Sequence, residues 1–138
     1  MTAGITIESA MTPYPYSIEL SAHISSAKAM LMQFGIRHLP VTDGEKLMGI
    51  ITLRDIKRAE ACGVDTSVGS DMRVEKLCSR DVYIVSPGEP LASVVRQMAE
   101  RYIGSALVAR NGRLAGIFTS SDALKRYADL LSGTAPRR

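Results

Sequence analysis

The sequence predicts an α/β protein made of two similar β-α-β-β-α repeats. The stretch Gly49–Asp55 (GIITLRD) returns as Gly116–Asp122 (GIFTSSD), with glycine, isoleucine, threonine and aspartate in the same frame. Around both stretches, short apolar runs alternate with runs of helical spacing, in the order strand, helix, strand, strand, helix. An internal repeat of this length predicts two halves that pack face to face about a pseudo-twofold axis.

The repeat covers most of the chain. A shift of 67 positions aligns residues 7–58 with residues 74–125 without a gap. The identical pairs are Glu8/Glu75, Tyr16/Tyr83, Ser26/Ser93, Ile36/Ile103, Val41/Val108, Leu47/Leu114, Gly49/Gly116, Ile50/Ile117, Thr52/Thr119 and Asp55/Asp122. We therefore expect a first repeat at 7–61, a Gly/Ser/Asp-rich linker at 62–73, and a second repeat at 74–131.

In the first repeat, Pro13 and Pro15 break the chain after a short amphipathic turn. Ser21 is expected to cap a helix that ends at Gly35, because apolar residues recur there at helical spacing. The Asp43-Gly44 pair is typical of a tight hairpin turn. The other expected elements are a strand at 16–18, hairpin strands at 36–41 and 47–52, and a helix at 53–61.

The second repeat is expected to copy this order. Its hairpin turn falls at Asn111-Gly112, a dipeptide that adopts positive φ angles easily. The expected elements are a strand at 83–85, a helix at 90–101, hairpin strands at 106–108 and 114–119, and a helix that runs to 131.

Composition limits the classes of function. The chain has 138 residues, 46% of them hydrophobic, which is enough for one substantial core. The net charge is +3 and no long Lys/Arg block occurs, which argues against a nucleic-acid partner. No apolar run approaches the ~20 residues of a membrane span, and the first residues do not resemble a signal peptide. We expect a soluble, cytoplasmic protein.

The repeated motif has the form of a helix start. Thr52 and Thr119 fall at the expected N-cap positions, and Asp55 and Asp122 follow three residues later, the spacing of a capping box. A helix N-terminus at a strand end offers backbone N–H groups and the positive end of the helix dipole, which suits a phosphate. The same pattern is also explained if both motifs are only caps. Both interpretations stay open at this point.

The sequence resembles a tandem pair of CBS domains, the family named after cystathionine beta-synthase. The resemblance covers about residues 7–128. It rests on Ile36-Arg37-His38-Leu39-Pro40-Val41 followed by the motif at 49–55, and on the matching motif at 116–122. Similar pairs occur in IMP dehydrogenase and in the gamma subunits of AMP-activated kinase. We expect the pair to stand alone here, with no room for a catalytic or channel domain.

The resemblance implies two clefts that hold adenosine compounds, one served by Thr52 and Asp55 and the other by Thr119 and Asp122. It implies an adenine nucleotide (AMP, ADP or ATP) as a regulatory ligand, with no cofactor required. S-adenosylmethionine and NAD are the alternative ligands. The full set of implied ligand-binding residues is Thr52, Arg54, Asp55, Arg37, His38, Thr119, Ser120, Ser121, Asp122, Ile18, Ile36, Val85 and Ile103.

The two implied clefts differ in charge. Arg37 and His38 stand where kinase gamma subunits carry phosphate-contacting basic residues, whereas the second repeat has Gly104 and Ser105. By the same resemblance, those basic side chains lean towards a nucleotide held by Asp122, so that cleft is expected to bind more tightly. Tyr16 and Tyr83 are interpreted as core tyrosines.

Catalytic and metal sites are not predicted. The chain has no Gly-x-Ser-x-Gly elbow and no Gly-x-x-x-x-Gly-Lys loop, and its two histidines and two cysteines lack metal-ligand spacing. We therefore expect a binding module and not an enzyme. The expected partners are a second copy of the chain and an unidentified regulated protein. A ligand-free dimerisation module is the alternative from a different class.

Overall fold

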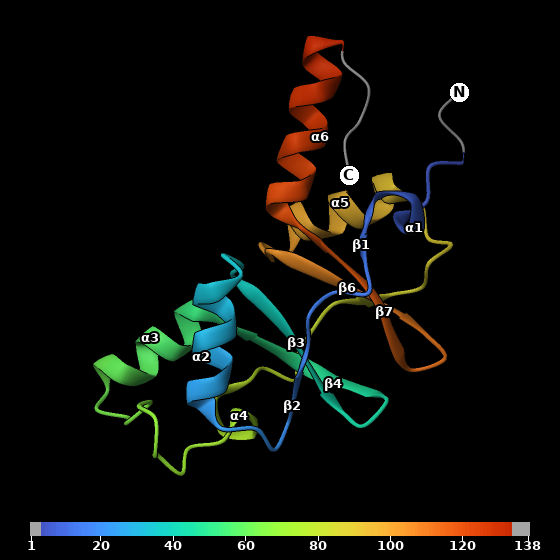
Figure 1. Cartoon of the computed structure of the whole chain (residues 1–138). Coiled ribbons are helices and arrows are strands. Elements are labelled where there is room, and N and C mark those ends of the chain that lie inside the picture. The colour runs from blue at the N-terminus through green and yellow to red at the C-terminus, as the bar shows by residue number, and fades with distance from the viewer. Residues whose placement is uncertain (1–3, 134–138) are drawn as a thin grey trace. The chain divides into compact units, whose positions relative to one another are not determined.

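The computed structural model describes residues 4–133, which form two compact units. The first unit consists of residues 16–82, and the second unit consists of residues 4–15 together with 83–133 (Figure 1). Each unit is an α/β structure, which confirms the predicted fold class.

The first unit is a three-stranded sheet with helices. Its strands lie in the order β2-β3-β4, with β2 parallel and β4 antiparallel to β3 (Figure 1). Its elements are β2 (Ile18–Glu19), α2 (Ile24–Gln33), β3 (His38–Asp43), β4 (Lys46–Thr52), α3 (Leu53–Ala61) and α4 (Val74–Leu77).

The second unit is a four-stranded sheet in the order β1-β7-β6-β5. Strand β5 is parallel to β6, and the other two pairings are antiparallel. Its elements are α1 (Ile7–Ala10), β1 (Thr12–Pro13), β5 (Ile84–Val85), α5 (Leu91–Glu100), β6 (Ser105–Arg110), β7 (Arg113–Thr119) and α6 (Ser120–Ser132).

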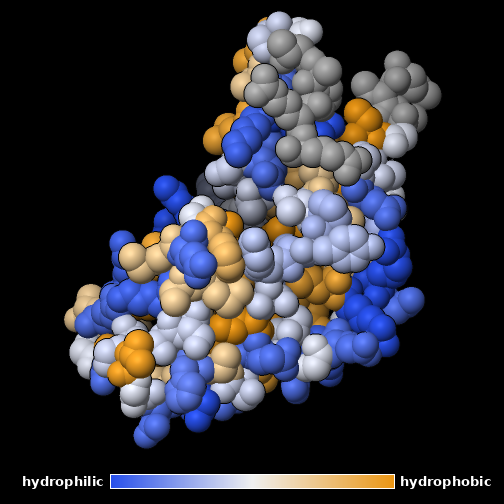
Figure 2. Space-filling model, in the orientation of Figure 1, coloured by the Kyte–Doolittle hydropathy of each residue, from blue (hydrophilic) through white to orange (hydrophobic). Residues whose placement is uncertain are grey.

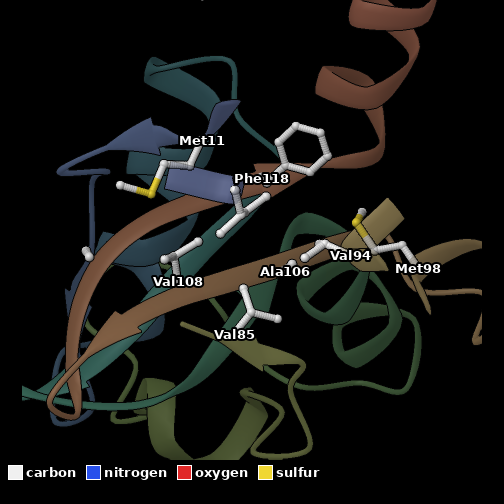
Figure 3. Packing of buried hydrophobic residues seen from close by; sticks show 9 residues of the cluster. Met11, Val85, Val94, Met98, Ala106, Val108 and Phe118 are labelled. Carbon is white, nitrogen blue, oxygen red and sulfur yellow. The ribbon is translucent and has the colours of Figure 1, made fainter. Parts of the chain in front are cut away.

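The two repeats exchange their first helical turns. Ile7 and Met11, from the start of the first repeat, are buried with Phe118 in the core of the second unit (Figure 3). Conversely, Val74 is fully buried in the core of the first unit, and Cys78 packs against that core. A single helical turn is not stable alone, so burial of its apolar residues holds each turn in place.

This exchange explains the glycine of the repeated motif. Residues Ile50 and Ser79 exchange backbone hydrogen bonds of 2.9 and 2.8 Å, which brings the segment after α4 across β4. A Cβ atom on Gly49 would overlap the Ser79 carbonyl. In the second unit, a Cβ atom on Gly116 would overlap the Met11 side chain. The motif glycines therefore serve close packing of the exchanged segments.

Two local features differ from the sequence-based expectation. The prediction that Ser21 caps α2 is wrong, because the helix begins at Ile24 with His23 at the N-cap and no side-chain cap bond. An unexpected strand, β1, pairs with β7 through Thr12 and Pro13. A proline fits there because β1 is the edge strand of its sheet.

Candidate functional site

The first candidate site lies where β4 passes directly into α3. Thr52 is the N-cap residue, and its backbone N–H donates to Oδ2 of Asp55 at 3.0 Å. The Asp55 N–H donates in return to Oγ1 of Thr52 at 3.1 Å. Among the described residues, Oδ1 of Asp55 accepts no hydrogen bond and the Thr52 hydroxyl donates none. One carboxylate oxygen and one hydroxyl proton are therefore open to a ligand.

Most backbone N–H groups at this helix start are already used. The Leu53 N–H donates to the Arg37 carbonyl at 3.3 Å, and the Asp55 N–H is used by the cap. The helix start therefore presents a carboxylate and retains few of the free amides that a phosphate site needs.

The second candidate site lies at the β7–α6 junction. More of the hydrogen-bonding groups of its cap are already used than at the first site. Oδ2 of Asp122 accepts the Thr119 N–H at 2.8 Å and also the Thr119 hydroxyl at 3.0 Å. The Asp122 N–H returns a bond of 3.3 Å to Thr119 Oγ1. The Ser120 N–H donates to the Gly104 carbonyl at 2.9 Å, so here too the first amide of the helix is used. Of this carboxylate, Oδ1 accepts no hydrogen bond from the described residues.

The other predicted site residues of the first unit differ in how accessible they are to a ligand. Arg37 precedes β3 and is exposed, and His38 is half-buried opposite Thr52 in the β3–β4 register. Arg54 is exposed on the first turn of α3. Ile36 keeps part of its surface open, whereas Ile18 is buried in the core, so only Ile36 offers ready apolar contact.

The second unit follows the same pattern. Ser120 and Ser121 are exposed on the first turn of α6. Ile103 is half-buried at the edge of the core, whereas Val85 is 3% exposed within it. Asp122 also lines a hollow of about 570 Å³, together with Ala10, Met11, Thr12, Pro13, Lys125, Arg126, Ala128 and Asp129. A larger hollow of about 840 Å³ near the β6–β7 turn contains none of the predicted site residues.

Aromatic side chains near the sites were misjudged from the sequence. Tyr16 is 53% exposed, so its interpretation as a core residue is wrong. Its ring stacks on Phe34, with the centroids 4.0 Å apart and the planes within 2°. At the equivalent positions of the second unit, the Arg101 guanidinium lies over the Tyr83 ring, 4.9 Å from its centroid. The shift of 67 positions that aligns the repeats also pairs Tyr16 with Tyr83 and Phe34 with Arg101. The alignment of the repeats could therefore have indicated both contacts.

Charge near the sites is set by local hydrogen bonds. The Lys28 ammonium and the Thr66 hydroxyl both donate to the Glu60 carboxylate on α3, and they lower its pKa below the usual 4.5. Burial, with a further contribution from Glu89, raises the pKa of Tyr83 above 10.0, and Arg101 acts in the opposite direction. Among residues 4–133, no three His, Cys, Asp or Glu side chains are grouped so that they could hold a metal ion.

No helix within the described part of the chain is both long enough and apolar enough to cross a bilayer.

The chain is similar to a known protein family over both repeats. The model described as the CBS domain matches twice, at residues 7–61 and 74–129. Together these matches cover most of the chain.

Solved structures with the same fold are similar over nearly the whole chain. A putative acetoin utilization protein (AcuB) from Vibrio cholerae is 29% identical with a TM-score of 0.81, and the match covers 93% of both chains. The CBS domain pair of protein MJ0100 in complex with 5′-methylthioadenosine and S-adenosyl-L-methionine is 28% identical with a TM-score of 0.76. That match covers 93% of this chain and 96% of the other.

The chain spans less than a third of the length of the first curated relatives that it matches. Homoserine O-acetyltransferase from Methanococcoides burtonii is 32% identical over 120 residues, which is 85% of this chain. The match spans only 23% of that enzyme's length, and the similarity is therefore to one part of it.

Proposed function

Because the chain belongs to the CBS domain family, we propose that it is a regulatory module that binds an adenosyl compound and reports its presence to a partner protein. The proposal is carried by the open carboxylate oxygen that each helix cap retains, on Asp55 and on Asp122. An ionised carboxylate accepts hydrogen bonds from the two ribose hydroxyls of an adenosyl group. The ligands of the MJ0100 pair are adenosyl compounds, which supports the same ligand class here.

S-adenosyl-L-methionine and 5′-methylthioadenosine are the first candidates, because the helix starts have little to offer a phosphate. Their first and third amides are used by the protein itself. Adenine nucleotides (AMP, ADP and ATP) are the second candidates. They are favoured by the exposed cations Arg37 and Arg54 beside the first site.

The proposed output is control of a regulated partner and not a reaction catalysed by these two repeats. Homoserine O-acetyltransferase from Methanococcoides burtonii has a segment similar to this chain within a polypeptide several times longer. The proposed module would act through an interface that responds to the adenosyl ligand.

The direct experiment is to denature the purified chain and identify released small molecules by mass spectrometry, followed by a melting assay with each candidate. A ligand at 100 times its Kd adds about 2.7 kcal/mol to the folded state. For a chain of this size this corresponds to a rise in Tm of about 5–10 °C. The double variant Asp55→Asn with Asp122→Asn is the matched control. The absence of any shift with all five compounds would leave the ligand-free module as the better description.

We also propose a symmetric homodimer formed through α6. This helix has no buried residue within the described chain, and its Leu124, Tyr127, Leu130 and Leu131 are 58–74% exposed. Hydrophobic side chains are visible along its edge in Figure 2. The equivalents of the first two in α3 are Lys57 and Glu60, so the apolar face is specific to α6.

The arrangement of α6 fits a second copy of itself. An antiparallel crossing centred on Tyr127 sets Leu124 against Leu130 and Lys125 against Asp129 of the other copy. Light scattering at micromolar concentration should give the mass of two chains, and Leu124→Glu should return it to one. A single-chain mass for the wild type would rule the dimer out.

A further inference from the structure

The larger hollow of the second unit, of about 840 Å³, lies away from the predicted adenosyl site. It is lined by residues within 6–14, which carry α1 and β1, and within 110–115, which form the β6–β7 turn. Strand β1 lies beside β7, so both segments belong to one sheet and its first helical turn (Figure 1). We call this feature the α1–hairpin hollow. Its volume is in the range of binding sites, ~300–1,000 Å³.

The lining of the α1–hairpin hollow is cationic. It contains two arginines, Arg110 and Arg113, and one carboxylate, that of Glu8. The Arg110 guanidinium donates to Oε2 of Glu8 at 2.7 Å, and both side chains remain more than half exposed. Since a guanidinium has several N–H donors, this ion pair leaves Arg110 able to bind a second carboxylate. Hydrophilic side chains cover the region of this turn in Figure 2. The hollow is therefore suited to an acidic group.

An exposed aromatic side chain also lines the hollow. Tyr14 is 90% exposed, and its φ angle of 48° is in the left-handed region, which costs free energy in a residue other than glycine. Its backbone N–H donates to the Ala115 carbonyl at 3.2 Å, next to the β1–β7 pairing. A ring this exposed contributes little to the packing of the fold, whereas tyrosine is enriched in the contact surfaces of protein complexes. Its conformation and exposure therefore favour contact with a partner.

The first repeat lacks this combination of positive charge and aromatic ring. The positions equivalent to Arg110 and Tyr14 are occupied by Asp43 and Asp81, whereas the position of Glu8 keeps its glutamate as Glu75. An acidic partner would be repelled there. The cationic lining is thus a property of the second repeat alone and is not required by the repeated fold.

The α1–hairpin hollow is connected to the Asp122 site through β1. Met11 and Pro13 line both this hollow and the smaller hollow that contains Asp122. Pro13 pairs with Gly116 on β7, the strand that ends at the Thr119 cap. A shift of β1 on binding of a ligand at Asp122 would therefore change the lining of the cationic hollow directly.

We propose that the α1–hairpin hollow is the surface through which the module binds its regulated partner, and that the partner contributes an extended acidic segment. Carboxylates of this segment bind Arg110 and Arg113, and the Tyr14 ring packs against the chain between them. An extended segment fits better than a small molecule, because Arg110 and Tyr14 are more than half exposed, whereas small-ligand pockets bury most of their ligand. This inference rests on the proposed function and names the chemistry of its partner.

A library of random peptides displayed on phage is the probe, selected against the full chain. The enriched peptides should be rich in aspartate and glutamate. A fluorescent copy of the most enriched peptide should bind with a micromolar Kd, measured by anisotropy, and added salt should weaken it. Enrichment of neutral or basic peptides, or of none, would overturn the inference.

A change of charge locates the peptide. Arg113→Glu should weaken the selected acidic peptide at least about tenfold, because it sets a like charge against the carboxylates of the peptide. Lys46→Glu, at the equivalent position of the first unit, alters the net charge by the same amount and is the matched control. It should leave the Kd nearly unchanged. Equal losses in the two variants would show non-specific attraction and contradict the proposal.

A second pair of variants keeps the test decisive if Arg113→Glu does not fold. Asparagine tolerates a positive φ angle, so Tyr14→Asn removes the ring and keeps the backbone conformation. It should weaken the peptide about tenfold without lowering the Tm. The control is Tyr102→Asn, because Tyr102 is 95% exposed with a φ angle of 55° but does not line the hollow. Wild-type affinity in Tyr14→Asn would contradict the proposal.

Two further measurements separate this inference from the proposed function. Saturation with 5′-methylthioadenosine should change the Kd of the peptide by about fivefold or more, and an unchanged Kd would overturn the role of the hollow in reporting the ligand. Binding of citrate with the same loss in Arg113→Glu would instead assign the hollow to a small carboxylate and overturn the peptide. A chain that binds the peptide but no adenosyl compound would overturn the proposed function and leave the acidic-segment site intact.

Discussion

The two helix caps share a motif but differ in what they leave open. At the first cap, Asp55 accepts one backbone N–H and the Thr52 hydroxyl donates to no described residue. At the second cap, Asp122 accepts both the N–H and the hydroxyl of Thr119. The threonine and aspartate of the motif therefore keep more hydrogen-bonding capacity for a ligand at the first cap than at the second. Identity of the motif residues does not make the sites equivalent, because the hydrogen bonds around them decide their remaining capacity.

The surroundings of the caps add to this difference. The first cap is followed by Arg54 and lies beside His38, whereas the second is followed by Ser120 and Ser121 and lies beside Ser105. The first unit also holds the Lys28–Glu60 ion pair, for which the second unit has Val95 and Tyr127. The first site is therefore set in the more charged environment.

The largest expected effect concerns the glycines that precede the caps. Gly49→Ala should lower the free energy of unfolding by about 3 kcal/mol, because the new methyl group meets a backbone carbonyl that cannot move aside. Gly116→Ala should cost about 1 kcal/mol, because it meets the flexible Met11 side chain. Urea unfolding measures both values. If the two residues are in contact, Met11→Ala should recover part of the stability that Gly116→Ala removes. No recovery in the double variant would show that they are not in contact.

The next effect distinguishes a phosphate ligand from a neutral one. If a nucleotide binds at the first site, Arg37→Ala should weaken AMP about tenfold, since a charge-assisted contact contributes about 1.5 kcal/mol. Adenosine should change little, and added salt should reduce the difference. Gly104→Ala, at the equivalent position of the second unit, is the control. Equal losses for adenosine and AMP, measured by calorimetry, would make the arginine structural.

A smaller effect separates the caps as structural elements. Asp122→Ala should lower the free energy of unfolding by about 1.5 kcal/mol and Asp55→Ala by about 1 kcal/mol, because Asp122 accepts one more hydrogen bond. Urea unfolding without ligand measures both. The opposite order would show that the extra hydroxyl bond at Asp122 contributes no stability.

The smallest expected effect is a pH dependence confined to the first unit. Because its partners lower the pKa of Glu60, this carboxylate stabilises the fold above pH 4.5, and the contribution is lost as the pH falls through the folded-state value. Urea midpoints recorded from pH 6 down to pH 3 should therefore fall less steeply in Glu60→Gln than in the wild type. Identical slopes would show that Glu60 does not contribute.

Much of this protein followed from local sequence patterns. The bounds of α3 were predicted as observed, and both hairpins and both capping boxes were found, because turn residues, apolar spacing and Thr-x-x-Asp act within a few residues. The fold class followed from the repeat. The assignment of ligand-binding roles to Thr52, Asp55 and the other site residues is still a prediction.

Only the tertiary structure decided which segments pack together and which polar groups are left unpaired. The exchange of the turns that carry Ile7 and Val74 is a long-range packing choice that no local pattern contains. The Thr119 hydroxyl donates to Asp122, whereas the Thr52 hydroxyl donates to no described residue, a difference that the identical motifs do not predict. Periodicity and turn propensity are properties of neighbours along the chain, whereas hydrogen-bond satisfaction is a property of neighbours in space.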